Sequence, residues 1–415
     1  MIPMDMAARG DHMSNASTRS QGVSYAIRDV VLPARALEKQ GIKVLHLNIG
    51  DPIKYDFDCP THMKDALYQA TKEGYNGYSP SEGDIELRQA IIAREKKRNR
   101  VGYALDDVCV TTGVTESLQM LANALLNPGD ELLIPGPTYP QYNLLPRLLD
   151  ACPIAYHTIE AESWQPDLDD IRQKISPKTK GLVLINPNNP TGALYSRSVI
   201  QHFIDLAGEY NLPIISDEIY DDIVFDGEQV ATATLAKDVP IITFNGLSKV
   251  YLVPGWRVGH TLFYHHGELD EVQDAFFRIA RSRLCANSVC QRAGIAALTG
   301  PQDHIKKMNT TLRKRRDFSY KRLNEIPGIS TAKPDGAFYI FPKIEAMDQG
   351  LWKDDKAFVL DLLQETHVLV VHGSGFCPTY GKHHFRAVFL PPIDVQEKAY
   401  DAFESFMKRK QQKGG

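Results

Sequence analysis

The chain has 415 residues, which is more than one hydrophobic core usually supports, so we expect a large domain with a smaller companion. Hydrophobic residues make up 43% of it, charged residues 24%, and the formal net charge is −4. This balance is typical of a soluble globular protein and argues against a nucleic-acid partner, which would need a basic surface.

The opening residues and the cysteines indicate where the protein works. Residues 1–23 lack the continuous apolar stretch of a secretory signal, and we interpret them as a flexible start or a tag remnant. No apolar run is long enough to span a bilayer, so we expect no membrane association. The six cysteines form no CxxC pair and no metal-ligand spacing with histidines, which favours a reducing cytoplasm and no metal site.

Short apolar runs alternate with amphipathic segments through the first two thirds of the chain. The runs at 108–112, 131–134, 154–159, 182–185, 213–216 and 241–244 predict strands. Helical spacing between them predicts helices at 115–126, 167–175 and 196–210. Because several of the strands are continuously apolar, we expect an α/β fold with a mostly parallel sheet and helices on both faces.

The pattern changes toward the C-terminus. Residues 268–326 read as nearly all helix, and we interpret their basic run LRKRRDFSYKRL as the solvated face of a long helix that links two domains. Strands at 337–341, 368–372 and 385–390 and helices at 356–365 and 395–408 then predict a compact α+β unit. We therefore predict a large domain over 60–310 and a small domain over 311–415, which the segment 24–59 joins.

Polar residues follow the predicted strands at the edge where α/β sheets bind ligands. Gly113, Val114 and Thr115 open a helix whose free backbone amides and hydroxyl could hold a phosphate, or Thr115 could simply cap that helix. The loop NPNNPTG at 186–192 is rigid enough to aim an amide at a phenolate oxygen, although a rigid turn is the alternative.

The next strand ends in Asp217, with Tyr220 three residues later. A carboxylate buried at a strand end needs a partner, and a protonated pyridine nitrogen is one that an aspartate could bind. Tyr220 could then bond a ring hydroxyl. The alternative is that Asp217 caps a helix.

The last predicted strand leads into Ser248, Lys249 and Arg257. A lysine amine condenses with a carbonyl when burial or a nearby cation lowers its pKa, and Arg257 could supply that cation while it grips an anion. An aldehyde cofactor with its own phosphate would use both residues, and pyridoxal phosphate is such a cofactor. By itself, Lys249 could equally be a surface lysine.

The combination NPNNPTG, SDEIY and SKxxxxPGWRVG resembles the fold type I pyridoxal-phosphate enzymes, the class I and II aminotransferases, over residues 48–390. The resemblance implies a sheet of the seven-stranded type. It also implies that Lys249 forms the Schiff base and moves the proton, that Asp217 pairs with the ring nitrogen, that Asn189 and Tyr220 contact the ring hydroxyl, and that Tyr139 stacks on the ring.

The same resemblance assigns the cofactor phosphate and the substrate. The phosphate ligands would be Val114, Thr115, Ser248 and Arg257, together with Tyr78 from the neighbouring subunit of a homodimer. Arg386 would bind the substrate α-carboxylate, with a backbone contact from Gly50. Many family members have a serine where this chain has Gly246, so one hydroxyl contact to the phosphate is expected to be missing.

Within the family, NIGDP, FNGLSKVY, RLCAN and GAFYIFPKI are similar to the bacterial-type alanine (glutamate-pyruvate) transaminases. That similarity implies ping-pong amino transfer between L-alanine and 2-oxoglutarate, giving pyruvate and L-glutamate. An aspartate or aromatic amino acid aminotransferase, or a carbon-sulfur lyase that uses the same cofactor, remains an alternative.

Overall fold

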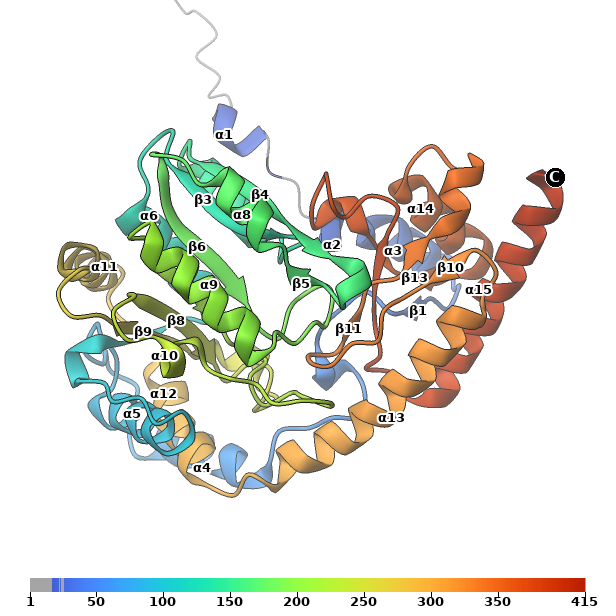
Figure 1. Cartoon of the computed structure of the whole chain (residues 1–415). Coiled ribbons are helices and arrows are strands. Elements are labelled where there is room, and N and C mark those ends of the chain that lie inside the picture. The colour runs from blue at the N-terminus through green and yellow to red at the C-terminus, as the bar shows by residue number, and fades with distance from the viewer. Residues whose placement is uncertain (1–16, 22, 24–25, 415) are drawn as a thin grey trace, which may run out of the picture.

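The computed structural model describes residues 17–21, 23 and 26–414. An eight-stranded sheet with the order β2-β9-β8-β7-β6-β3-β4-β5 forms the larger half of the molecule (Figure 1). Its strands are β2 (Val108–Thr111), β3 (Glu131–Gly136), β4 (Cys152–Ile159), β5 (Gln165–Pro166), β6 (Thr179–Ile185), β7 (Ile214–Asp217), β8 (Ile241–Gly246) and β9 (Gly259–Tyr264). The predicted mostly parallel α/β sheet is confirmed, and β5 adds a two-residue edge strand to the seven-stranded type.

Strand β9 is the longer of the two strands of the sheet that were not predicted from the sequence, the other being the two-residue β5. It pairs antiparallel with β2 on one side and β8 on the other, whereas the long strands from β8 to β4 in the sheet order pair with one another in parallel. Gly259, His260 and Thr261 open the strand, so it lacks the continuous apolar run by which its neighbours were recognised. All three residues are nevertheless buried, because β9 lies inside the sheet.

Helices cover both faces of the sheet, as predicted. Successive side chains of a strand point to opposite faces, and those of β6 divide accordingly between two cores. Leu182 and Leu184 pack in the core that contains Phe203 of α9 (Arg197–Glu209). Val183 and Ile185 pack in the core that contains Leu118 of α6 (Val114–Leu125). Helices α8 (Leu168–Lys174) and α10 (Thr232–Leu235) pack with α9, whereas α7 (Gln141–Leu148) and α11 (Asp270–Ser282) pack with α6.

One edge of the larger half consists of helices instead of strands. Helix α12 (Ser288–Thr299) packs against α4 (Thr61–Lys72) and α5 (Ile85–Arg98), two helices that the sequence analysis did not predict. The predicted helical stretch at 268–326 is confirmed as α11, α12 and α13 (Asp303–Glu325), with short breaks between them. Among the described residues, no helix is long and apolar enough to cross a bilayer.

Helix α13 connects the two halves of the molecule and carries the basic run (Figure 1). The prediction that this run is a solvated face is wrong for two of its arginines. Arg316 is 1% exposed and donates to Asp226 and to the carbonyl of Pro334, and the buried Arg315 pairs with Asp56. Buried charges are tolerated only when they are paired. These paired guanidinium groups therefore attach α13 to both halves of the molecule.

The smaller half is built on a three-stranded sheet of β11 (Tyr339–Ile340), β15 (Phe385–Val388) and β14 (Val371–His372). Two strand pairs flank it, β10 (Ile329–Ser330) with β12 (Lys343–Ile344) and β1 (Leu45–His46) with β13 (Val368–Leu369). Helices α3 (Val31–Lys39), α14 (Asp355–Thr366) and α15 (Ile393–Gly414) complete it. The pairing of β1 attaches the N-terminal segment to this half.

The predicted domain boundaries stay predictions, and α13 runs continuously through the one at 310/311. Most of the segment 1–23, interpreted as a flexible start or a tag, lies outside the described residues. The described part of that segment contains the short helix α1 (Thr18–Gln21), and α2 (Ala26–Asp29) follows it.

Candidate active site

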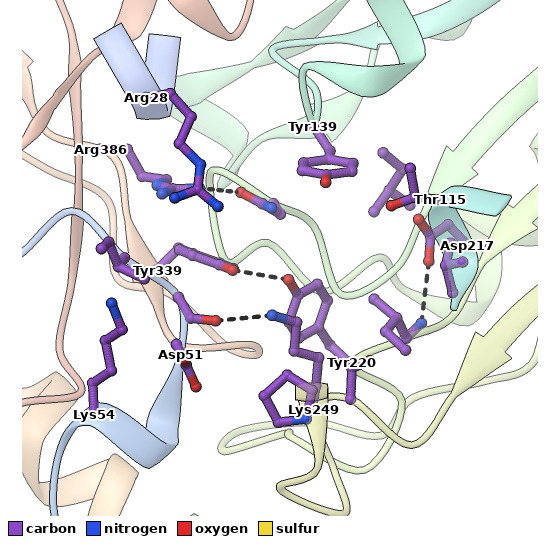
Figure 2. A pocket seen from close by; sticks show the side chains of 18 of the residues that line it. Arg28, Asp51, Lys54, Thr115, Tyr139, Asp217, Tyr220, Lys249, Tyr339 and Arg386 are labelled. Carbon is purple, nitrogen blue, oxygen red and sulfur yellow. Dashed lines mark hydrogen bonds between the residues drawn. The ribbon is translucent and has the colours of Figure 1, made fainter. Parts of the chain in front are cut away.

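A cavity of about 340 Å³ lies where β2, β6, β7 and β8 end, between the two halves of the molecule (Figure 2). Every predicted site residue except Tyr78 lines it. These residues are Gly50, Val114, Thr115, Tyr139, Asn189, Asp217, Tyr220, Ser248, Lys249, Arg257 and Arg386. The parallel arrangement brings most of them together, because the carboxyl ends of parallel strands meet at one edge of a sheet. Gly50 comes from the N-terminal segment and Arg386 from β15 of the smaller half.

Lys249 extends into this cavity from the segment that follows β8. Its Nζ donates a hydrogen bond of 2.8 Å to the carbonyl oxygen of Gly50. Burial is the largest of the causes that together lower the pKa of Lys249 to about 8; Arg386 and Arg257 also lower it, while Asp51 and Asp217 raise it. The sequence predicted that burial or a nearby cation such as Arg257 lowers this pKa, and burial is the larger cause. The amine is therefore partly neutral near pH 8, as a nucleophile or base must be.

Asp217 ends β7 and is 3% exposed. The Tyr142 hydroxyl donates to its Oδ2 over 2.9 Å, and the Ile219 amide donates to Oδ1 over 3.3 Å. Burial nevertheless raises the pKa of Asp217 to about 6. Because two hydrogen bonds do not compensate for burial, this carboxylate is suited to a cationic ligand such as a protonated ring nitrogen. Tyr142 was not predicted from the sequence, although it lies in the same PTYPQY segment as Tyr139.

Tyr220 and Tyr339 come from the two halves of the molecule, and their hydroxyls are 2.9 Å apart in a hydrogen bond. Tyr339 was also missed, although it belongs to the GAFYIF motif. A side chain at Gly50 would collide with the Tyr339 ring, so only glycine fits there. The contact therefore brings the N-terminal segment, the large sheet and the smaller half together around Lys249.

Arg386 lies on β15 and is 1% exposed. Its Nη1 donates to Asn189 Oδ1 over 3.0 Å, and its Nη2 donates to the carbonyl of Asn48 over 2.6 Å. A guanidinium group only donates, so Asn189 must turn its oxygen to Arg386 and keep its amide nitrogen for another acceptor. The donation to a phenolate that we predicted for the NPNNPTG loop is compatible with this orientation.

The end of the cavity near β2 has the features of an anion site. Helix α6 begins at Val114, and the first amides of a helix have no acceptor within it. Arg257 is fixed there by hydrogen bonds of 3.1 Å to the Pro254 carbonyl and 2.9 Å to the Thr112 carbonyl. Gly113 has a φ of 89°, and a side chain there would collide with the Arg257 guanidinium. The donors present fit a phosphate group.

Gly246 lies beside this anion site, at the end of β8. A Cβ placed on it would come within 2.8 Å of Gly259 Cα and of the Val258 carbonyl, because β8 and β9 approach closely there. The serine that many family members carry at this place has no room here unless β9 shifts. The missing hydroxyl therefore follows from the packing of two glycines.

Tyr78 is the predicted site residue that this chain does not bring into the cavity. Its side chain is 84% exposed. Two further exposed aromatic residues lie nearby in the sequence, Tyr68 and Tyr75.

In the part of the chain that the structure describes, no cluster of histidine, cysteine or acidic side chains is arranged to hold a metal ion.

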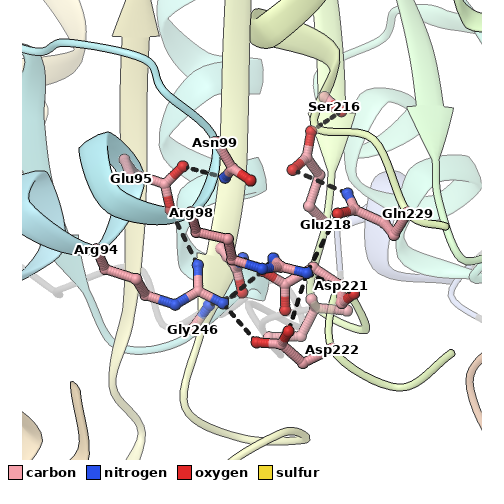
Figure 3. Close-up of polar contacts among 12 residues, drawn as sticks. Arg94, Glu95, Arg98, Asn99, Ser216, Glu218, Asp221, Asp222, Gln229 and Gly246 are labelled. Atoms are coloured by element: carbon pink, nitrogen blue, oxygen red, sulfur yellow. Dashed lines mark hydrogen bonds and ion pairs between the residues drawn. The ribbon is translucent and has the colours of Figure 1, made fainter. Parts of the chain in front are cut away.

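A second polar cluster, the α5 cluster, lies next to the site (Figure 3). We define it as Arg94, Glu95, Arg98, Asp221 and Asp222. Arg94 and Arg98 each approach Asp221 Oδ2 to 2.6 Å and also pair with Asp222.

This cluster is connected to the cavity through the chain. Asp221 follows Tyr220 directly, and its Oδ2 accepts a hydrogen bond of 2.9 Å from Asn245 Nδ2. Asn245 in turn lies four residues before Lys249. The α5 cluster therefore supports both segments that carry cavity residues after β7 and β8.

Comparisons with known proteins agree with this geometry. Residues 42–399 match the family model of aminotransferase class I and II. Glutamate-pyruvate aminotransferase AlaA of Escherichia coli (strain K12) is 39% identical over 94% of this chain and 97% of its own length. Alanine aminotransferase of Mycobacterium tuberculosis (strain ATCC 25618 / H37Rv) is 38% identical over 90% and 88%.

The solved structure of an alanine aminotransferase from Pyrococcus furiosus superposes with a TM-score of 0.93 at 58% identity, covering 95% of this chain and 100% of that one. The resemblance inferred from the motifs is confirmed, and the family depends on pyridoxal phosphate. The chain belongs to the class I and II aminotransferases.

Proposed function

We propose that this aminotransferase exchanges the amino group between L-alanine and 2-oxoglutarate, giving pyruvate and L-glutamate. The observation that carries the proposal is the position of the Lys249 amine, buried in one cavity with Asp217 and Arg386. The substrate pair is supported by the similar proteins, which are named as alanine or glutamate-pyruvate aminotransferases.

The cavity residues divide into those that hold the cofactor and those that hold the substrate. Val114, Thr115, Ser248 and Arg257 would bind the phosphate of pyridoxal phosphate, and Asp217 would keep its ring nitrogen protonated. Tyr139 would pack on the ring, and Asn189 and Tyr220 would bond its hydroxyl. The cofactor contributes an electrophilic carbon and an electron-withdrawing ring.

The remaining cavity residues act on the amino acid. Arg386 binds the α-carboxylate bidentately, in an orientation fixed by Asn189 and Asn48, and Gly50 adds a backbone contact. This orients the α-carbon toward Lys249. Its amine would remove the α-proton of the donor amino acid and, in the second half-reaction, deliver a proton to the α-carbon of the acceptor. The two substrates react in turn, so the kinetics are ping-pong.

We also propose that the enzyme is a cytoplasmic homodimer in which Tyr78 reaches the cofactor phosphate of the neighbouring subunit. The exposure of Tyr78 and of Arg257 supports this, because both would be covered by a partner. Sedimentation should give twice the chain mass. Mixing inactive Tyr78→Ala and Lys249→Ala subunits should restore part of the activity, since one site of the mixed dimer is then intact, and a monomeric active enzyme would contradict the proposal.

The experiment that tests the function is a spectroscopic panel on the purified holoenzyme. Single amino acids are added while the conversion of the cofactor to its amine form is followed by absorbance, and individual 2-oxo acids are then used to reverse it. Alanine and glutamate should convert it efficiently, and pyruvate and 2-oxoglutarate should reverse it. Conversion by aspartate or aromatic amino acids alone, or release of ammonia without a 2-oxo acid, would reject the proposal.

A further inference from the structure

The cavity contains more positive charge than the proposed roles use. Its lining includes five basic residues, Arg28, Lys54, Lys249, Arg257 and Arg386, but only two acidic ones, Asp51 and Asp217. The phosphate uses Arg257, and the substrate α-carboxylate uses Arg386. Arg28 and Lys54 have no role in the scheme so far.

Neither of these two side chains has a polar partner in the described part of the protein. Arg28 and Lys54 form no hydrogen bond or ion pair with the described residues, and both side chains are exposed. Within the described part of the chain, Asp51 forms no ion pair with either of them, and its Oδ1 accepts a hydrogen bond from the Ile53 amide. Both cations are therefore available to a ligand in the cavity.

Arg28 lies on the substrate side of the cavity. It extends from α2, and Figure 2 shows its guanidinium directed into the cavity on the side where Arg386 and Tyr139 lie. The anion site that holds the phosphate is formed by other elements, α6 and the segment around Arg257. An anion bound by Arg28 would accordingly belong to the substrate rather than to the cofactor.

We propose that Arg28 binds the second carboxylate of a dicarboxylic substrate, that is, the side-chain carboxylate of glutamate or 2-oxoglutarate. The proposal rests on the proposed function, which requires one cavity to accept both a methyl group and a carboxylate. An arginine suits this carboxylate because its guanidinium group can bind it with two parallel hydrogen bonds.

The exposure of Arg28 explains how the same cavity accepts alanine. A buried arginine would be left unpaired beside the alanine methyl group, at a high cost in free energy. An exposed arginine stays hydrated when alanine is bound and exchanges water for carboxylate when glutamate is bound. Selectivity then comes from one side chain that is engaged in only one of the two half-reactions.

The test compares Arg28→Met with Lys54→Met, which removes a charge of the same sign from the same cavity. Each half-reaction is measured alone on the holoenzyme, and the readout is the ratio of kcat/KM for L-glutamate to kcat/KM for L-alanine. Arg28→Met should lower this ratio about 10- to 100-fold, the range expected for lost charge-assisted hydrogen bonds, and Arg28→Lys should restore part of it. Lys54→Met should leave the ratio within about twofold of the wild-type value.

A binding measurement separates this proposal from the proposed function. Calorimetry of the holoenzyme with glutarate, a dicarboxylate, and with butyrate, a monocarboxylate, does not require turnover. Arg28→Met should weaken only glutarate binding. An unchanged ratio, an equal loss in both variants, or unchanged glutarate binding would overturn the assignment of Arg28. If the wild-type enzyme converts neither alanine nor glutamate, the proposed function fails instead.

Discussion

Two groups of charged side chains lie close together near the ends of β7 and β8, and they differ in whether the protein itself supplies partners of opposite charge. In the α5 cluster, Asp221 is paired with Arg94, Arg98 and Asn245. In the cavity, Asp217 has two uncharged hydrogen-bond donors, and the amine of Lys249 has a carbonyl. Charges that the protein neutralises itself stabilise the fold, whereas charges that it leaves for a ligand mark the site.

The largest effect on activity is expected at Lys249, which lies in the cavity and donates to a carbonyl oxygen. The Lys249→Ala variant should lose about 10⁴-fold or more in both half-reactions, because the proposed mechanism assigns the movement of the α-proton to this amine. Its melting temperature should change little, since the lysine makes one hydrogen bond. Single-turnover absorbance measures the first quantity and calorimetry the second. A variant that turns over at the normal rate would refute the role of Lys249.

Asp221 should show the opposite behaviour. Replacing it with asparagine leaves Arg94 and Arg98 without their most buried partner, and we expect the free energy of unfolding to fall by about 3–5 kcal/mol. Urea titration followed by circular dichroism measures this. Asp222→Asn is the matched control, because Asp222 is 24% exposed where Asp221 is 1% exposed, and its loss should be smaller. Equal losses would mean that burial does not decide the effect.

The sequence predicted six strands of the large sheet and 11 of the 20 residues that line the cavity, because buried strands, the loops after them and the family motifs are local features of a sequence. An apolar run marks a buried strand, and short motifs with unusual glycine and proline content mark the loops at its end. Contacts between distant segments have no such signal. Tyr142 of α7 reaches Asp217 at the end of β7, and Arg28 of the N-terminal segment reaches the cavity, only in the folded chain.

Burial was the other quantity that the sequence could not supply. The basic run of α13 has the composition of a solvated surface, yet Arg315 and Arg316 are buried against Asp56 and Asp226. The low pKa of Lys249 likewise depends mainly on how deeply the fold encloses it and less on the neighbouring arginine. Neither property can be read from the identity of sequence neighbours.

Asp217 provides a test in which activity and stability should change in opposite directions. Asp217→Asn should slow both half-reactions by roughly 10²- to 10³-fold, because the ring nitrogen loses its ionic partner. The substitution should weaken cofactor binding less than it slows the half-reactions, and equilibrium dialysis measures that affinity. A variant with unchanged turnover would remove Asp217 from this role.

In the cofactor-free protein the same substitution should be stabilising. The pKa of Asp217 is raised from 3.8 to about 6 by burial, so the folded protein binds this proton more tightly than the unfolded chain does. The folded state therefore loses stability as the pH rises from about 4 to 6 and carries the full cost above pH 6. At pH 8, Asp217→Asn should be more stable than the wild type by roughly 1–3 kcal/mol, and the difference should vanish below about pH 4. Thermal unfolding across this pH range would measure it.

The smallest effect is expected at Tyr142, which modifies Asp217 without touching a ligand. Tyr142→Phe removes one hydrogen bond from the carboxylate and keeps the ring in its buried place, so the pKa of Asp217 should rise further. A single hydrogen bond to a charged group contributes about 1.5–3 kcal/mol, but the Ile219 amide and the ring nitrogen remain, so we expect only a 2- to 10-fold loss of kcat. The decisive measurement is the pH profile of the half-reaction, whose acid limb should move to higher pH. A uniform loss of rate with an unmoved acid limb would indicate that Tyr142 only fills space.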